Sequence, residues 1–232
     1  MRDLCLRCLR PKSSCYCKYT KPVDSKVKFV FLMHPKEAKK NRTGTGRLAS
    51  LCLPDSEIIM GIDFSSNERL QALLNDPQYF PMLMYPGEDA WNASKPDFKL
   101  TVGNKTLLVI LIDSTWFCSK KMIKYSQNLL KLPKLSFSGS YRSIFTFKHE
   151  PEEYCVSTIE SCYYLIKELQ SADMVNKEVN PEPLMNVFKH MIVHQLEAQN
   201  QRIESGQPGT HAYDAKYTKK KEIPDFTFTD ED

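Results

Sequence analysis

The pattern of apolar and polar residues divides the chain into short continuous apolar runs and longer amphipathic stretches. The clearest run is Leu107–Ile112, six apolar residues in a row, followed by Asp113 and turn-forming residues. A run of this length with turn residues after it is typical of a strand buried on both faces of a parallel sheet. Similar runs predict further strands at residues 27–33, 57–62, 82–85 and 142–147.

Between these runs, apolar residues at helical spacing predict helices. Ser66 is expected to cap the first helix, and Ser157 with Glu160 forms the S-x-x-E pattern of a capping box at the third. Strands that alternate with helices predict an α/β protein with a mostly parallel sheet flanked by helices. The predicted helices cover residues 67–75, 117–130, 157–170 and 181–202.

Three segments are expected. Residues 1–22 contain half of the cysteines, residues 23–204 carry the alternating strands and helices, and residues 205–232 lose apolar periodicity. The last segment is rich in glycine, proline and charge, so we expect a flexible tail.

Composition excludes several classes of protein. Hydrophobic residues make up 41% and charged residues 26%, as in a soluble globular protein. No apolar run reaches the roughly 18 residues needed to span a bilayer, and the N-terminus lacks a signal peptide. We therefore expect a cytoplasmic protein without membrane contact, and no obligate protein partner is evident. A net charge of +4 permits an RNA partner without requiring one.

The four N-terminal cysteines have the spacing of metal ligands. Cys5, Cys8, Cys15 and Cys17 form C-x2-C-x6-C-x-C. Four thiolates this close suit a tetrahedral Zn²⁺, and with every position filled by sulfur the metal would be structural. One alternative is a disulfide pair, which a reducing cytoplasm disfavours. The other is free thiols, which the crowding of four cysteines disfavours. Basic residues inside the cluster could also contact RNA phosphate.

Asp113 occupies the position where α/β sheets place their chemistry, just beyond the carboxyl end of a central strand. The position alone does not separate an active-site carboxylate from a cap for the following helix. Likewise, residues 85–90, YPGEDA, could form a cofactor loop or an ordinary turn into a helix.

A basic loop follows the first strand. Glycines keep its backbone accessible, which favours phosphate contact over a merely solvated surface. His34, at its start, is by itself more typical of a structural hydrogen-bonding residue than of a catalyst. The positive residues of the loop are Lys36, Lys39, Lys40, Arg42 and Arg47.

Six motifs in order resemble the DTW-domain family, and the resemblance spans roughly residues 5–195. Each motif alone is weak, but their order is specific. Two departures are visible: Gly44 stands where the family often has Asn, and Ser114 where it often has Gly. The motifs are the cysteine cluster, His34-Pro35-x-Glu37, Thr45-Gly46-Arg47, YPGEDA at 85–90, DSTW at 113–116 and STIE at 157–160.

The resemblance implies a branch of the knotted SPOUT superfamily whose members are tRNA-uridine aminocarboxypropyltransferases. Such enzymes transfer the 3-amino-3-carboxypropyl group of S-adenosylmethionine to N3 of a uridine and release 5′-methylthioadenosine. The resemblance implies a catalytic stretch of Asp113, Thr115 and Trp116, in which Asp113 is the base or orienting group. Thr115 is expected to cap the following helix as well. Trp116 could stack on a base or pack under the helix, and packing is favoured because an aromatic residue on an apolar helix face usually belongs to the core.

The resemblance also suggests binding residues. The expected S-adenosylmethionine pocket is formed by Tyr85, Pro86, Gly87, Glu88, Ser138, Ser157 and Thr158. The expected contacts to tRNA are His34, Arg42, Arg47, Lys120, Lys121 and Arg142. Two alternatives stay open at this point: a SPOUT-type RNA methyltransferase and a non-enzymatic zinc-knuckle RNA-binding protein.

Overall fold

A computed structural model describes residues 3–40, 44–145, 155–207 and 219–229. Its centre is a five-stranded sheet in the order β2-β1-β4-β3-β5, and all of the strand pairs are parallel. This confirms the α/β class and the mostly parallel sheet. The strands are β1 (Lys28–Met33), β2 (Ser56–Met60), β3 (Tyr79–Met84), β4 (Thr106–Asp113) and β5 (Lys134–Leu135).

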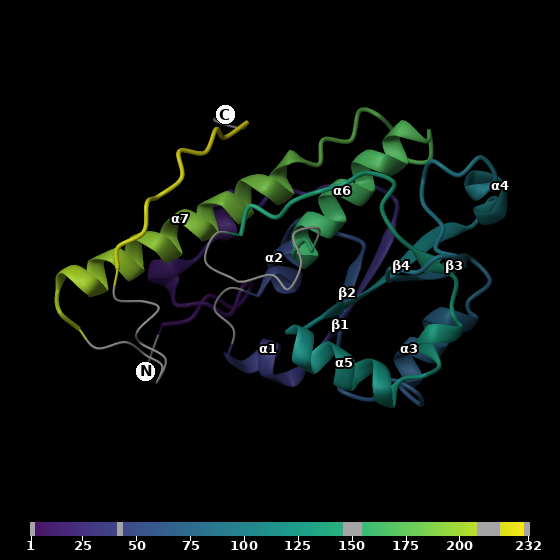
Figure 1. Cartoon of the computed structure of the whole chain (residues 1–232), viewed down its shortest axis with the longest axis horizontal. Coiled ribbons are helices and arrows are strands. Elements are labelled where there is room, and N and C mark those ends of the chain that lie inside the picture. Colours follow the sequence, from purple (N-terminus) through teal and green to yellow (C-terminus); the bar gives the residue numbers. More distant parts are fainter. Residues whose placement is uncertain (1–2, 41–43, 146–154, 208–218, 230–232) are drawn as a thin grey trace.

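Helices cover both faces of the sheet (Figure 1). One apolar cluster joins the sheet to α2, α4, α6 and α7, and a second joins it to α3 and α5. β4 supplies both clusters by alternation, with Leu107 and Val109 in the first and Leu108 and Ile110 in the second. The helices are α1 (Pro35–Lys40), α2 (Thr45–Cys52), α3 (Glu68–Asn75), α4 (Phe98–Val102), α5 (Trp116–Tyr125), α6 (Thr158–Ser171) and α7 (Glu182–Glu204), with 3-10 turns at Lys12–Ser14, Cys17–Tyr19 and Leu129–Lys131.

Some predicted element boundaries were wrong. Residues 142–145 form no strand, and the rest of the expected strand at 142–147 lies outside the described residues. The helix expected at 117–130 ends at Tyr125, because the buried Ser126 turns inward and accepts the Phe64 N–H at 2.9 Å. The cap of α3 is Asn67, not Ser66; its Oδ1 accepts the Leu70 N–H at 2.9 Å.

The parallel strands bring their carboxyl ends to one edge of the sheet. Met33, the last residue of β1, is in register with Asp113, the last residue of β4. The next residue, His34, donates its backbone N–H to the Asp113 carbonyl at 3.1 Å. This edge therefore collects the residues that follow β1, β3, β4 and β5. The knot implied by the resemblance stays a prediction.

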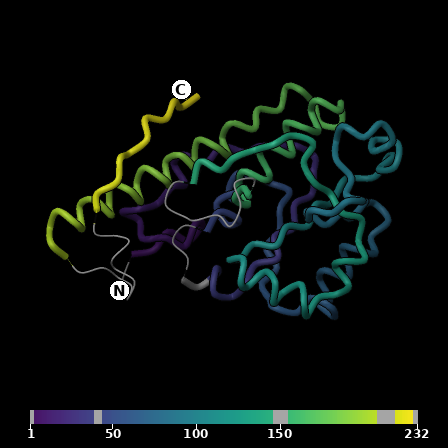
Figure 2. The backbone as a smooth tube through the Cα atoms, viewed as in Figure 1, coloured from purple at the N-terminus to yellow at the C-terminus, as the bar shows by residue number. Residues whose placement is uncertain are grey.

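The cysteine segment packs on α7. The hydroxyl of Tyr16, which is buried, lies 3.2 Å from His194 Nδ1, and the Tyr19 ring stacks on His190 at 3.6 Å. On the other side of His190 lies Phe228, at 4.3 Å. Residues 219–229 run along α7, as Figure 2 shows in yellow. No helix in the described part of the chain is long and apolar enough to cross a membrane.

Candidate active site

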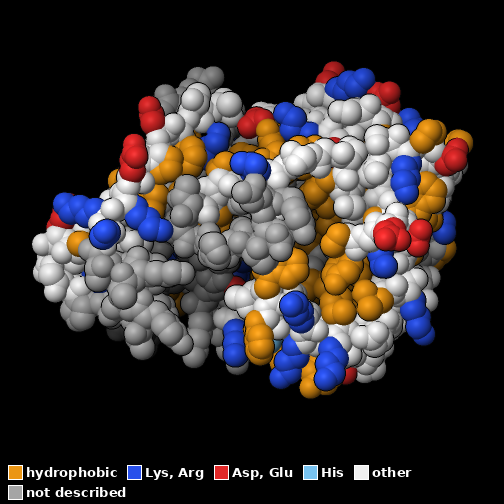
Figure 3. Space-filling view, in the orientation of Figure 1, with side chains coloured by type: hydrophobic (Ala, Val, Ile, Leu, Met, Phe, Trp, Pro, Cys, Tyr) orange, Lys and Arg blue, Asp and Glu red, His pale blue; other side chains and the backbone are white. Residues whose placement is uncertain are grey.

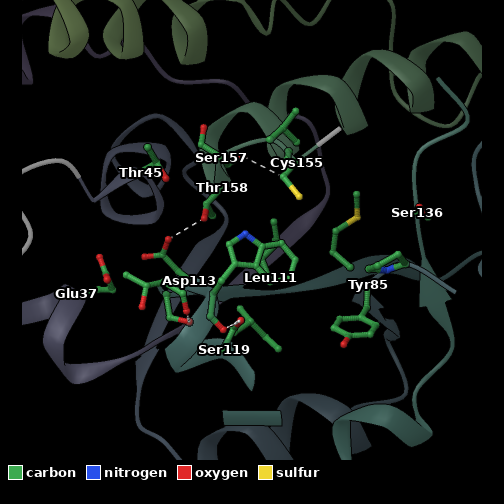
Figure 4. A pocket seen from close by; sticks show the side chains of 18 of the residues that line it. Glu37, Thr45, Tyr85, Leu111, Asp113, Ser119, Ser136, Cys155, Ser157 and Thr158 are labelled. Carbon is green, nitrogen blue, oxygen red and sulfur yellow. Dashed lines mark hydrogen bonds between the residues drawn. The ribbon is translucent and has the colours of Figure 1, made fainter. Parts of the chain in front are cut away.

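Asp113 is fixed at the carboxyl end of β4. Its side chain is only 5% exposed, and its Oδ1 accepts a hydrogen bond from the Thr158 hydroxyl at 2.7 Å. Figure 4 shows this bond, with Thr158 at the start of α6. The sequence left open whether Asp113 caps a helix or serves a site; the carboxylate reaches across to α6, 45 residues further along the chain, and the N-cap residue of α5 is Thr115.

Gly46 allows this carboxylate to approach α2. A Cβ on Gly46 would lie 2.5 Å from both Cγ and Oδ2 of Asp113, closer than real side chains approach. The carboxylate thus lies beside the first turn of α2 and the first turn of α6. Both helix N-termini carry partial positive charge from their unpaired backbone N–H groups. The glycine of the T-G-R motif is explained by this close approach.

A cavity of about 590 Å³ opens in front of Asp113. The size suits a small organic cofactor or a nucleoside. Its lining includes the apolar side chains of Met84, Leu135 and Phe137. Glu37 and Thr45 lie near Asp113, on the side of the cavity away from Tyr85 and Ser136 (Figure 4). Segments after β1, β3, β4 and β5 and the start of α6 all contribute to its lining.

The cavity mouth carries aromatic side chains. Trp116 is 46% exposed and lines the cavity, so the expectation that it packs beneath its helix was wrong. The buried side of α5 is formed by Cys118 and Met122 instead. Thr115 is the N-cap residue of α5, as expected from its position, but its hydroxyl makes no capping hydrogen bond. It is exposed and also lines the cavity.

The residues expected to bind the cofactor are only partly brought together. Tyr85, Pro86, Ser157 and Thr158 line the cavity, and so do Ser136 and Phe137, which belong to the S-F-S-G-S-Y turn that was expected to line the cofactor pocket. Among the described residues, the lining does not include Gly87, Glu88 or Ser138. Gly87 packs against Lys134, whose Cδ would lie 3.1 Å from an added Cβ.

Two buried carboxylates on α6 hold the segment that includes Phe137 of the cavity lining. Glu168 accepts hydrogen bonds from the backbone N–H groups of Ser138 and Gly139 and from the Tyr141 hydroxyl, each at 2.9 Å. Burial, and then the charge of Glu168, raise the pKa of Tyr141 to about 12. No local sequence pattern marks Glu168, because its partners lie 27–30 residues away.

The second of these carboxylates, Glu160, is the last residue of the STIE motif. It is fully buried and accepts hydrogen bonds from the Ser157 N–H at 2.8 Å and the Ile144 N–H at 2.8 Å. The capping box is confirmed. Glu160 additionally ties residues 143–144 to α6, a role that the capping pattern did not predict.

The residues expected to contact RNA differ in exposure. Lys120, Lys121 and Arg142 are exposed, and Arg47 is half-buried on α2. Arg42 lies outside the described residues. His34, by contrast, is 4% exposed; burial, and then Lys36, lower the pKa of its ring.

The ring of His34 has a structural contact. Its Nδ1 accepts the Lys36 N–H at 3.1 Å, so the neutral ring carries its proton on Nε2. This arrangement fixes the turn from β1 into α1, which places Glu37 in the cavity lining. Glu37 belongs to the H-P-x-E motif, which was noted in the sequence without a role being assigned to this carboxylate.

The four N-terminal sulfurs form a candidate metal centre. They all lie within 4.8 Å of one another, with Cys5 and Cys17 Sγ 3.8 Å apart and Cys8 and Cys15 Sγ 3.6 Å apart. Tetrahedral Zn–S bonds of about 2.3 Å place sulfurs about 3.8 Å apart, so the set fits zinc. Backbone N–H groups of Cys8 and Arg7 lower the pKa of the Cys5 thiol to about 6.

The comparisons with known proteins agree with the motif order. A relative from Drosophila melanogaster, tRNA-uridine aminocarboxypropyltransferase 2, is 27% identical over 198 residues, which cover 82% of this chain and 76% of the relative. No solved structure matches the chain. The family model for the DTW domain matches residues 2–196, which confirms the resemblance. Since this match spans most of its length, the chain belongs to the DTW-domain family.

Proposed function

We propose that this protein is a tRNA-uridine aminocarboxypropyltransferase, which uses S-adenosylmethionine to modify N3 of a uridine. Membership of the DTW-domain family and the name of the Drosophila relative support the proposal. The structural observation that carries it is the Asp113 carboxylate, which is fixed between two helix N-termini at the floor of a 590 Å³ cavity.

The cavity residues fit S-adenosylmethionine. Met84, Leu135 and Phe137 offer apolar surface to an adenine ring, and Tyr85 also lines the cavity. Glu37 and Asp113 supply negative charge suited to a sulfonium and an ammonium group. When bound, S-adenosylmethionine supplies an electrophilic γ-carbon with methylthioadenosine as a good leaving group.

Asp113 acts on the uridine. Its carboxylate accepts a hydrogen bond from N3–H and so aligns the imide for in-line attack, while Thr158 keeps the carboxylate from rotating. As N3 attacks the γ-carbon, this proton passes to the Asp113 carboxylate, and Glu37, half-buried in the cavity lining, is the candidate group that carries it on.

Trp116 stands at the cavity mouth, where an exposed indole can stack on the entering base. The Thr158 hydroxyl is bonded to Asp113, and the hydroxyl and backbone N–H of Ser157 are bonded to Glu160, so the start of α6 contributes to cofactor binding through the remaining backbone N–H groups of its first turn. Arg47, half-buried on α2, and the exposed Arg142 are further candidates for contact with tRNA phosphate.

The four cysteines hold a structural zinc ion. All four positions of a tetrahedral ion would be filled by sulfur, which leaves none for a catalytic water. Tyr16 and Tyr19 connect this centre to α7, because their side chains contact His194 and His190 of that helix. Thiolate ligands of this kind persist in a reducing compartment, which agrees with a cytoplasmic protein.

Nucleoside mass spectrometry tests the proposal. Unmodified tRNA transcripts are incubated with the protein and S-adenosylmethionine, digested and analysed. We expect uridine to gain an aminocarboxypropyl group and methylthioadenosine to accumulate. A methyl gain with S-adenosylhomocysteine would identify a methyltransferase, and tRNA binding without modification would identify a binding protein.

A further inference from the structure

Helix α5 presents an aromatic and basic surface next to the cavity. Phe117 is 82% exposed and lines the cavity mouth beside Trp116. Lys120, Lys121 and Lys124 follow at helical spacing and are all exposed. We call Phe117 and these three lysines the α5 face.

Helix geometry explains why these four side chains share one stripe. Positions three, four and seven residues after Phe117 return to the same side of an α-helix. Cys118 and Met122 occupy the opposite side and are buried against the sheet. The α5 face is therefore turned to solvent over the whole length of the helix, and Phe117 contributes nothing to the core.

The charge of the α5 face has one sign. α5 contains no acidic residue, and no ion pair found among the described residues uses its lysines. The positive potential reaches the sheet edge, because Lys121 helps to lower the pKa of His34. Figure 3 shows lysine and arginine side chains beside hydrophobic ones over the area where Figure 1 places α1 and α5.

We propose that the α5 face docks the single-stranded RNA that flanks the target uridine, with a neighbouring base stacked on Phe117 and phosphates held by the lysines. This inference rests on the proposed function and adds that the substrate uridine lies in an unpaired segment. An aromatic ring among lysines, without acids, has the chemistry of a single-strand site. Its continuity with the cavity places it beside the reacting base.

The depth of Asp113 gives an independent reason for an unpaired substrate. A carboxylate that is 5% exposed at the floor of a cavity is out of reach of a base inside a duplex. The base must leave its stack, which is least costly in a loop or bulge. Its neighbour then loses a stacking partner, and Phe117 is placed to replace it.

Phe117→Ala tests the stacking contact. Base–aromatic stacking predicts that this substitution weakens binding of an oligouridine strand by about 5- to 150-fold. Leu100→Ala is the matched control, because Leu100 is 79% exposed and belongs to α4, which Figure 1 places far from α5. We expect Leu100→Ala to keep the wild-type affinity for both oligouridine and S-adenosylmethionine.

Salt dependence tests the lysines. Removing one lysine that binds a phosphate of a single strand should reduce the slope of log K against log salt by about 0.7. Lys120→Gln, Lys121→Gln and Lys124→Gln together should therefore lower the slope by about 2, whereas Phe117→Ala leaves it unchanged. Lys105→Gln, at an exposed lysine before β4, is the charge control. Annealing the oligouridine strand to oligoadenosine should abolish the Phe117 effect.

The proposal is overturned if Phe117→Ala binds oligouridine as tightly as Leu100→Ala does, or if the duplex binds as tightly as the single strand. Either result would leave the α5 face to another partner, such as a protein. The proposed function fails separately: tRNA would show no aminocarboxypropyl uridine even though oligouridine binding still depended on Phe117.

Discussion

Gly46→Ala should disable the site by displacing one carboxylate. The new Cβ would lie 2.5 Å from Cγ and Oδ2 of Asp113, whereas ordinary contact begins at 3.4 Å. The carboxylate cannot yield easily, because it is 5% exposed and bonded to Thr158 at 2.7 Å. A shift approaching 1 Å at a reacting group lowers the rate by about 100-fold. Overpacking costs about 1–3 kcal/mol of folding stability.

A double-mutant cycle with Asp113→Ala separates the clash from helix propensity. Alanine is a better helix former than glycine by up to about 1 kcal/mol, so without the carboxylate the same substitution should stabilise α2. We therefore expect Gly46→Ala to lower the free energy of unfolding in the wild type and to raise it in Asp113→Ala. Urea denaturation measures both values, and transfer to tRNA measures activity.

Two results together would refute the close packing of Asp113 against α2. The Gly46→Ala protein would retain wild-type transfer activity, and the substitution would raise the free energy of unfolding equally in the wild type and in Asp113→Ala. That outcome would mean that the carboxylate has room to move. It would also remove the physical reason for glycine in the T-G-R motif.

Three further results are expected. Cys8→Ser, or chelation, should lower the bound zinc and the Tm while S-adenosylmethionine affinity is kept, as metal analysis and calorimetry would show; loss of the chemical step alone would contradict a structural metal. Glu168→Gln should raise KM for S-adenosylmethionine more than it lowers kcat and should bring the pKa of Tyr141 down from about 12, which ultraviolet titration measures; an unchanged Tyr141 titration would contradict the contact. Because burial lowers the pKa of His34, the unfolded chain binds its proton more readily, so stability should fall as pH drops below the ordinary histidine value of about 6.5. This slope should be smaller in His34→Gln, and equal slopes would contradict a neutral ring.

The fold could be predicted largely because its strands are buried on both faces. The apolar run before Asp113 predicts a strand whose two faces are both buried, and the structure places this strand, β4, at the centre of the sheet. The order of the strands could not be predicted, since pairing depends on contacts between distant segments. Residues 142–145 resemble a strand locally, but hydrogen bonds from Ser143 and Ile144 to the distant Glu160 hold them in an irregular path.

Site residues could be predicted where a local sequence motif contains the reactive group. They could not be predicted where their role depends on contacts with distant segments of the chain. Asp113 was found from its place after β4, whereas Glu168 has no local signature. Trp116 was misassigned because the helical period marks which residues are apolar, not which side is buried. At Gly44, the structure shows an N-cap position without a side-chain bond, so the asparagine common in the family would cap α2 there.

The central claim is that Asp113 orients a tRNA uridine for aminocarboxypropyl transfer. Nucleoside mass spectrometry of tRNA treated in parallel with wild-type protein and Asp113→Asn tests it most directly, provided that both bind S-adenosylmethionine equally. We expect aminocarboxypropyl uridine from the wild type and a loss of about 100-fold or more in the variant, because the amide of asparagine cannot accept the N3 proton. Full transfer by Asp113→Asn, or a methyl group on the wild-type product, would contradict this role of Asp113.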